Sequence, residues 1–591
     1  MSDPLISLCM IVKNEAASLP RCLQSVKGIV DEMIVVDTGS TDDTVSIALS
    51  FGASIVHAAW QNDFAAARNA GLEVAFGRWI LFLDADEALE PSEGPQLRML
   101  AASNEIEGFF LDIHNYVGNG EQGATINPVL RMFRNRPQHR FEGRIHEQIA
   151  ASIVRHRPGA AFHLSGLRIH HYGYQHAVVQ SKNKVERNMG LLETALAEEP
   201  DNSFYRYNLG VEYLRTGRAA EALTLFRQAL SGIDRINVSY AHLVSKYEIR
   251  CLQSLGRWEE ALQVSANALQ LHPDYTDLLH CKALCEMTLG DNTAALATMM
   301  QAIEQGAPPQ AYHTEEGIGT YQTAYVLGEL WEQRGEYDEA LKWYRESLRL
   351  RSSLTPPLYR MFHLMRITGR EDELASWLNG SFRIASVEAL SKVIAILLHC
   401  RCGAACLDLL NSKQGRRLPA AFRASAEAEA LMLTGALHEA SGKLQAFARR
   451  EGEEPAHAAL RDRLRWLADQ PGRLRDPLAA ALASGQPHEA DERLLALVTA
   501  EPAHWYALQK LLEAGMSGGR LNKFGRLLRT WQQLLERPES PALAVEAFMH
   551  SMTAAAEHHL TQLQSAAGDT GAGGREAITT LRLLLPKEDG L

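Results

Sequence analysis

Apolar runs and amphipathic stretches alternate along the first 175 or so residues of the chain. Four apolar runs predict buried strands, at residues 5–12, 33–36, 53–57 and 79–83. Helical spacing of apolar residues predicts a helix near residues 19–26, and two more helices are expected, one capped by Ser40 or Thr41 and ending near Phe51, the other over residues 64–75. This alternation predicts a mainly parallel sheet with helices on both faces, and therefore an α/β domain at residues 1–175.

A different period begins near His176, where the chain becomes helical and an internal repeat appears. Equivalent alanines lie at Ala222, Ala261, Ala295 and Ala340, separated by 39, 34 and 45 residues. This frame resembles the tetratricopeptide repeat, a helix pair of 34 residues, and the longer spacings predict loop insertions. We expect repeats over residues 176–352 and divergent helical repeats over residues 353–591, with a break at the GDTGAGG segment of residues 568–574.

The repeat array also predicts a function. Stacked helix pairs build an extended concave surface, which suits an extended peptide or a partner protein. An array that only adds bulk or mediates dimerisation is the alternative.

Composition narrows the class of protein. A chain of 591 residues is too long for one core, so two or more domains are expected. The formal net charge is -12 and there is no long basic run, which argues against a nucleic-acid ligand.

Cysteine usage and the N-terminal residues bear on the compartment. The eight cysteines form no pair of CxxC motifs, and the cluster Cys400, Cys402 and Cys406 is interpreted as helix-core thiols rather than a metal site. The first residues lack the pattern of a signal peptide, and no apolar run reaches the roughly 18 residues of a membrane span. We expect a cytoplasmic protein without a transmembrane segment, with peripheral attachment to a membrane left open.

Asp84 and Asp86 follow the apolar run of residues 79–83, where the chain leaves the sheet. On an extended backbone, side chains at i and i+2 point the same way. Two such carboxylates suit a Mg²⁺ or Mn²⁺ ion that also holds a diphosphate, and that ion would neutralise a departing nucleotide. An acidic pair that caps a helix or faces solvent is the alternative.

Further polar residues end the neighbouring strands. Glu15 follows the first strand and Asp37 ends the second, and ligands of open parallel sheets bind beyond the carboxyl ends of strands. Both carboxylates can accept hydrogen bonds from a nucleotide base or ribose, and helix capping is the alternative for each.

Three segments together carry a resemblance to a known family. SLCMIVKNEAASLPRCLQSV, MIVVDTGSTDDT and DFAAARNAGLEVAFGRWILFLDADE occur in the order and spacing of glycosyltransferase family 2, whose fold is called GT-A. The coupling to repeats resembles the SunS-like bacterial glycosyltransferases, which act on peptides, and a related subgroup without an array adds sugars to lipopolysaccharide core. The resemblance implies a nucleotide-sugar donor and a uridine pocket lined by Glu15 and Asp37.

The resemblance also implies roles around the acidic pair. It places Arg68 and Asn69 near the nucleotide and diphosphate, gives Asp84 a part in ribose and metal contacts, and makes Asp86 the direct metal ligand. Because two carboxylates rarely complete the shell of such a cation, a third protein ligand or water is expected. The two candidates for that ligand are His171 and His146.

Inversion by a single displacement needs one general base beside the acceptor nucleophile. The candidates are Glu142 and Glu147, in a segment that resembles the acceptor side of the family, and Glu147 is favoured. A salt bridge with an arginine such as Arg144 is the alternative role. Arg131 is expected to contact the acceptor or a phosphate, or merely to line its strand.

The leading hypothesis is a metal-dependent, inverting glycosyltransferase that moves a sugar from a UDP-sugar to a peptide or protein held by the repeat array. One alternative changes the acceptor to a cell-envelope glycan or lipopolysaccharide core. The other is a scaffold protein whose transfer domain is inactive.

Overall fold

The computed structural model describes residues 5–116, 124–172 and 178–451, except 381–383, 385, 401 and 435. The chain divides into two compact units between Thr323 and Ala324. The expected break at residues 568–574, and all of the array beyond residue 451, lie outside the described residues.

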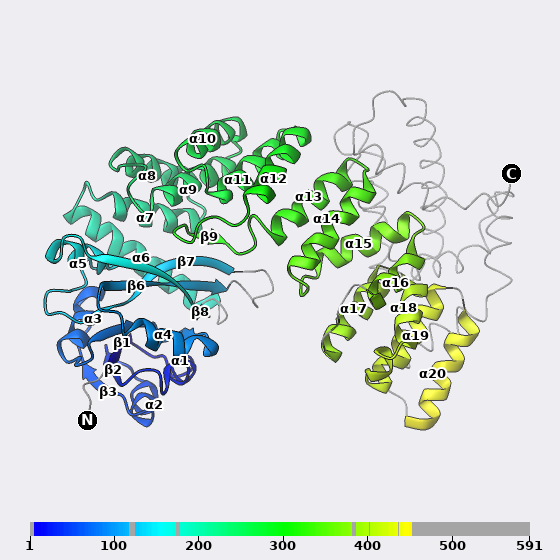
Figure 1. Ribbon diagram of the computed structural model, residues 1–591, viewed down its shortest axis with the longest axis horizontal. Helices are drawn as coiled ribbons and strands as arrows, with labels where there is room; N and C mark the ends of the chain where they lie inside the picture. Colours follow the sequence, from blue (N-terminus) through cyan, green and yellow to red (C-terminus); the bar gives the residue numbers. More distant parts are fainter. Residues whose placement is uncertain are drawn as a thin grey trace, which may run out of the picture. The chain divides into compact units, whose positions relative to one another are not determined.

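The N-terminal part of the first unit is built on a mixed sheet (Figure 1). Its strand order is β3-β2-β1-β4-β7-β6-β8-β5, with β9 pairing β7 from outside this path. The strands are β1 (Ile6–Val12), β2 (Glu32–Asp37), β3 (Ser54–His57), β4 (Trp79–Phe82), β5 (Glu87–Leu89), β6 (Ile106–Tyr116), β7 (Ala124–Arg134) and β8 (Ala161–His171). The helices are α1 (Leu19–Val26), α2 (Thr44–Ser50), α3 (Phe64–Glu73), α4 (Gly94–Leu100) and α5 (Ala150–His156). The first four strands are parallel, which confirms the predicted α/β class. The prediction of a mainly parallel sheet is wrong, because β7 pairs antiparallel with β4, β6 and β9, and β5 pairs antiparallel with β8.

Strands β1 and β4 are almost wholly apolar because both of their faces are covered. On β4, Trp79 and Leu81 join the core that contains α1, whereas Ile80 and Phe82 join the core that contains α3. Two cores on opposite faces fix β4 rigidly, and the end of β4 is where the acidic pair lies.

One predicted helix start is wrong. Helix α2 begins at Thr44, not at Ser40 or Thr41. The reason is that this turn binds the loop after β1: the Asn14 amide donates to Ser40 Oγ at 3.0 Å, and the Thr41 amide donates to Asn14 Oδ1 at 2.7 Å.

The predicted helix pairs follow. They are preceded by α6 (Val178–Glu198) and comprise α7 (Ser203–Arg215), α8 (Ala219–Ser231), α9 (Ala241–Ser254), α10 (Trp258–Leu271), α11 (Thr276–Thr288), α12 (Asn292–Gln305), α13 (Tyr321–Gln333) and α14 (Tyr337–Leu350). The small residues act as expected, because a Cβ at Gly210 would lie 2.7 Å from the Phe226 ring and one at Gly328 would lie 2.4 Å from Tyr344. Close approach of the paired helices therefore requires glycine there.

The 45-residue spacing contains an insertion that returns to the sheet. Between α12 and α13, β9 (Thr314–Glu315) pairs antiparallel with Thr125 and Ile126 of β7. We call residues 306–320 the strap. Figure 1 shows β9 between the repeat helices and β7.

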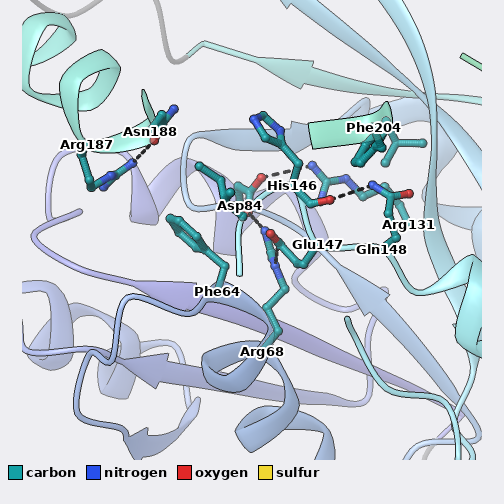
Figure 2. A pocket seen from close by; sticks show the side chains of 12 residues that line it. Phe64, Arg68, Asp84, Arg131, His146, Glu147, Gln148, Arg187, Asn188 and Phe204 are labelled. Carbon is teal, nitrogen blue, oxygen red and sulfur yellow. Dashed lines mark hydrogen bonds and ion pairs between the residues drawn. The ribbon is translucent and has the colours of Figure 1, made fainter. Parts of the chain in front are cut away.

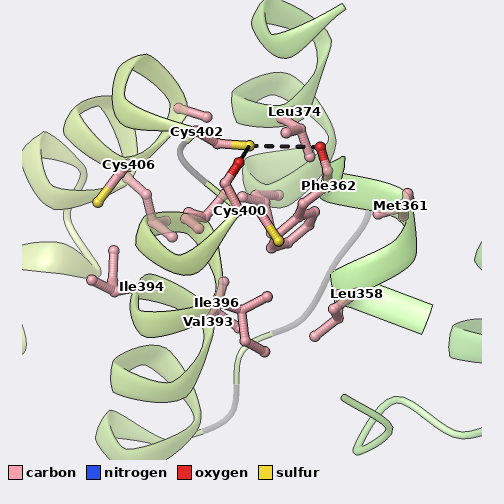
Figure 3. Close-up of a cluster of buried hydrophobic side chains, with 14 of the residues drawn as sticks. Leu358, Met361, Phe362, Leu374, Val393, Ile394, Ile396, Cys400, Cys402 and Cys406 are labelled. Carbon is pink, nitrogen blue, oxygen red and sulfur yellow. Dashed lines mark hydrogen bonds between the residues drawn. The ribbon is translucent and has the colours of Figure 1, made fainter. Parts of the chain in front are cut away.

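The second unit continues with helices. They are α15 (Pro356–Ile367), α16 (Glu371–Gly380), α17 (Val387–His399), α18 (Gly403–Asn411), α19 (Ala420–Leu433) and α20 (Leu437–Glu451). Cys400, Cys402 and Cys406 lie in its apolar core (Figure 3). Burial raises the pKa of Cys400 and of Cys406 to about 12, so these thiols are packing groups.

Candidate active site

The acidic pair lies in a tight turn, not on an extended backbone. The Glu87 amide donates to the Asp84 carbonyl at 3.0 Å, and this bond closes a turn between β4 and β5. The prediction that both carboxylates point the same way assumed an extended backbone, and the turn shows that this assumption is wrong. Asp84 and Asp86 make contacts with different partners.

Asp84 belongs to a cluster of charged side chains at the end of β4, which we call the site cluster. Its members are Arg68, Asp84, Glu87, Arg131 and Glu147 (Figure 2 shows four of them). Arg68 Nη2 reaches Asp84 Oδ1 at 3.3 Å, and Arg131 Nη2 reaches Asp84 Oδ2 at 3.1 Å. Arg68 Nε also bonds Glu147, and Arg131 Nη2 also bonds Glu87.

Two guanidiniums face three carboxylates in this cluster, and the pKa values of Asp84 and Glu87 shift in opposite directions. Burial alone would raise the pKa of Asp84, but Arg131 and Arg68 hold that pKa well below its usual range. Burial raises the pKa of Glu87, which is 2% exposed, although Arg131 opposes the shift. Asp84 therefore stays ionised at the surface of the site.

Glu147 lies on a loop that is held at several points. The side-chain amide of Asn69 donates to the Phe141 carbonyl at 3.0 Å and accepts from the Phe141 amide at 2.9 Å. Two backbone bonds between Glu142 and Gln148 close the loop. The side-chain amide of Asn69, which was expected near the nucleotide, therefore holds the loop that carries Glu147.

The repeat helices hold the same loop from the other side. Ile145 is buried, and it packs with Leu192 of α6 and with Tyr205 and Leu209 of α7. Arg144 pairs with Glu198 of α6 at 3.0 Å, rather than with Glu147. The first helices of the array therefore position the loop that bears the candidate base.

A cavity of about 350 Å³ opens onto this cluster (Figure 2). The α/β domain contributes most of the cavity wall, and helices α6 and α7 contribute the rest. Its lining residues are Phe64, Arg68, Asp84, Val129, Arg131, Ile145, His146, Glu147, Gln148, Arg187, Asn188 and Phe204. The cavity thus unites the charged cluster with the beginning of the repeat array.

Asp86 meets His171, the first of the two candidate histidines. Strand β5 pairs with β8, and this pairing brings His171 Nε2 to 3.3 Å from Asp86 Oδ2. His171 Nδ1 lies 2.6 Å from Asn115 Oδ1, which accepts its proton and so directs Nε2 at Asp86. His146 lines the cavity instead and does not join this pair.

The Asp86–His171 pair fits a divalent cation as a partial shell. Within the described ranges, no three His, Cys, Asp or Glu side chains lie together in a way that would hold a metal ion. A carboxylate and an imidazole are nevertheless suitable ligands when a substrate diphosphate and water supply the rest. A bound cation would replace the proton between Asp86 and His171 Nε2.

The other candidates lie apart from the cavity. Asp37 accepts from the Ser40 amide at 3.0 Å and from the Gly39 amide at 3.3 Å, and although burial opposes it, bonding from Ser40 lowers the pKa of Asp37. Glu15 accepts from Ser18 Oγ at 2.5 Å. Glu142 pairs with Arg155 through both carboxylate oxygens, at 2.5 and 2.8 Å.

Sequence reasoning missed several residues of the site. Glu87 had a signal, since it directly follows Asp86 as a third acidic residue. No signal in the sequence marked the cavity residues Arg187, Asn188 and Phe204. Their helices were interpreted only as the beginning of the array.

Comparisons with known proteins agree with an N-terminal α/β domain followed by helical repeats. The profile of the family described as Glycosyl transferase family 2 matches residues 7–159, and a tetratricopeptide repeat profile matches residues 190–235 and 320–354. A TPR repeat-containing protein of Synechococcus elongatus is 35% identical over 290 residues, which is 46% of this chain and 70% of that protein. The SPbeta prophage-derived glycosyltransferase SunS of Bacillus subtilis is 30% identical over 257 residues, which is 43% of this chain and 60% of SunS.

Among solved structures, a tetratricopeptide repeat protein from Parabacteroides merdae covers 48% of this chain and 93% of its own, at 17% identity and a TM-score of 0.27. No helix in the described part of the chain is both long enough and apolar enough to cross a membrane.

Proposed function

The chain belongs to glycosyltransferase family 2, joined to tetratricopeptide repeats, and on this premise we propose that it transfers a sugar from a UDP-sugar to a peptide or protein acceptor. The observation that carries the acceptor class is the cavity wall. Helices α6 and α7 of the array line the same cavity as Asp84 and Glu147, so an acceptor held by the array reaches the reacting groups directly.

The proposed reaction is a single displacement with inversion. The acceptor nucleophile forms a bond to the anomeric carbon while the bond from that carbon to the nucleoside diphosphate breaks, and the proton of the nucleophile passes to Glu147. Arg68 binds Oε1 of Glu147, and among the described residues no donor reaches Oε2, which leaves that oxygen for the acceptor proton. Glu142 is the weaker candidate because Arg155 occupies both of its oxygens.

The remaining residues are assigned to the donor. Asp86 and His171 would hold the Mg²⁺ or Mn²⁺ ion, whose charge stabilises the leaving diphosphate. Asp84, kept ionised by Arg68 and Arg131, would accept from a ribose hydroxyl. Glu15 lies in the loop after β1 and Asp37 ends β2, where they would frame the base. Asp37 also accepts the hydrogen bond that holds its own turn.

The test is donor hydrolysis and self-glycosylation with a panel of UDP- and GDP-sugars in Mn²⁺. Wild type should release nucleotide from one UDP-sugar, and Asp86→Ala should abolish that release. Asp291→Ala, which removes the capping carboxylate of α12, is the matched control and should behave as wild type. Turnover of a GDP-sugar alone would overturn the uridine assignment, and full activity of Asp86→Ala would overturn the metal assignment.

A further inference from the structure

Two parts of the array are candidates for holding an acceptor: the face formed by α9 and α11, and the end formed by α6 and α7. The strap already covers the face of α9 and α11. The Tyr312 ring stacks on Tyr275 at 4.8 Å, the His313 amide donates to His242 Nε2 at 3.3 Å, and the Tyr275 hydroxyl donates to the His313 carbonyl at 2.7 Å.

The charged contacts of the strap are equally complete. Thr314 Oγ1 donates to Asp277 Oδ2 at 2.6 Å, and the Glu315 amide donates to Asp277 Oδ1 at 3.3 Å. Lys246 Nζ lies 3.1 Å from Glu315, and Arg250 also pairs with it. Aromatic stacking, backbone bonds and paired charges are how a repeat groove binds an extended peptide. Here the bound peptide is the chain's own residues 312–316.

The end of the array differs, because its side chains face the cavity. Arg187 and Asn188 of α6 and Phe204 of α7 line the cavity beside Asp84 and Glu147. Arg187 Nη2 donates to Asn188 Oδ1 at 3.1 Å, and the Arg187 guanidinium lies 5.5 Å from the Phe64 ring centroid. In the described part of the chain, no carboxylate pairs with Arg187.

Arg187 therefore stands apart from the other two cavity arginines. Arg68 and Arg131 are neutralised by Asp84, Glu87 and Glu147. A guanidinium at a cavity wall without a carboxylate partner suits an anionic group of a ligand, because it binds a carboxylate or a phosphate through two N–H groups. The Asp86–His171 pair, assigned to the donor diphosphate, does not line this cavity.

We propose that α6 and α7, and not the face of α9 and α11, bind the acceptor, and that Arg187 selects an acceptor segment with an acidic residue beside its acceptor side chain. This inference rests on the proposed function. Phe64 and Phe204 supply the apolar contacts of the same segment, and Glu147 meets its nucleophile.

The test uses the full chain, the UDP-sugar that it hydrolyses, and a library of ten-residue peptides. Each peptide carries a central Ser, Thr, Cys or Asn with neighbours drawn from Asp, Lys, Ala and Gly, and sugar addition is read by mass spectrometry. Wild type should enrich Asp over Lys by roughly tenfold. Arg187→Glu should reverse that preference, while Arg257→Glu, at an exposed arginine of α10's N-cap, should keep it.

The possible results separate the two levels of the proposal. If folded Arg187→Glu keeps the preference for Asp over Lys, the inference alone is overturned. A raised KM of this variant for the UDP-sugar, measured by hydrolysis without peptide, would also overturn it, because that result would assign Arg187 to the donor phosphate. Donor hydrolysis without any peptide product in wild type would overturn the acceptor class, and with it this inference. Should Arg187→Glu fail to fold, Arg187→Gln must lose the Asp preference.

Discussion

The first unit contains two buried clusters of charge that differ in how completely their atoms are paired. The array cluster comprises Lys246, Arg250, Asp277 and Glu315. Asp277 is fully buried, and its oxygens accept from Lys246, Thr314 and the Glu315 amide. In the site cluster, by contrast, the Asp84 side chain is 38% exposed, and Arg68 Nη1 and Arg131 Nε have no partner among the described residues.

This difference separates a structural role from a binding role. A fully paired cluster fixes two elements against each other, in this case the strap against α9 and α11. Buried donors without partners cost free energy, and a site retains them where a ligand completes their bonds. The array cluster should therefore govern stability, and the site cluster should govern catalysis.

The largest effect is expected from the candidate base. Glu147→Gln keeps the shape of the side chain but removes its capacity to accept a proton, so kcat for transfer should fall by about 10² to 10⁴ while affinity for UDP stays the same. Glu142→Gln, whose carboxylate is engaged by Arg155, is the control and should keep full kcat. Equal losses in the two variants would refute the choice of Glu147.

Breaking the array cluster should cost stability instead. Lys246→Met leaves the Asp277 carboxylate buried without its cation, which should lower the free energy of unfolding by about 3–5 kcal/mol in urea titrations. Lys342→Met removes a lysine from an exposed pair with Glu339 and should cost less than about 1 kcal/mol. Activity per folded molecule should survive in both variants, and its loss in Lys246→Met would blur the distinction between the clusters.

Ligand binding should stabilise the protein through the residues assigned to the donor, which include Asp84 of the site cluster. UDP with Mn²⁺ at one hundred times its dissociation constant should add about 2.7 kcal/mol to the free energy of unfolding. The measurement is thermal unfolding with UDP, with Mn²⁺, and with both. No shift in melting temperature under any of these conditions would favour the inactive scaffold.

The smallest expected effect is a loss of stability at low pH. Burial would raise the pKa of Glu315, but Lys246 and Arg250 outweigh it and lower the pKa to about 2. Because the folded pKa lies below the unfolded value, this contribution is present above pH 4.5 and is lost as the pH falls toward 2. The loss should be on the order of 2 kcal/mol. Urea titrations of Glu315→Gln should show a flatter dependence on pH across that interval.

Local patterns predicted much of the fold. The apolar runs located β1 to β4, and the recurring alanines and glycines located the helix pairs, because both signals come from residues close together in the chain. The strap is different. The 45-residue spacing predicted an insertion, but nothing in the sequence of that insertion indicated pairing with β7. Pairing over such a distance depends on tertiary contacts that no local period records.

The candidate site shows the same limit. Asp84 and Asp86 were found by their position after an apolar run, yet the turn that separates their side chains was not. The meeting of Asp86 with His171 was anticipated as one of two choices, and the pairing of β5 with β8 produces it.

One substitution made in both clusters tests the central claim most directly. Asp84→Asn and Asp277→Asn each remove one charge, and each protein is measured for donor hydrolysis per folded molecule and for melting temperature. The account predicts that Asp84→Asn loses hydrolysis and melts only slightly lower, because its partly exposed ion pairs contribute little stability, while Asp277→Asn melts much lower and hydrolyses as wild type. Full hydrolysis by Asp84→Asn, or its loss in folded Asp277→Asn, would contradict the account.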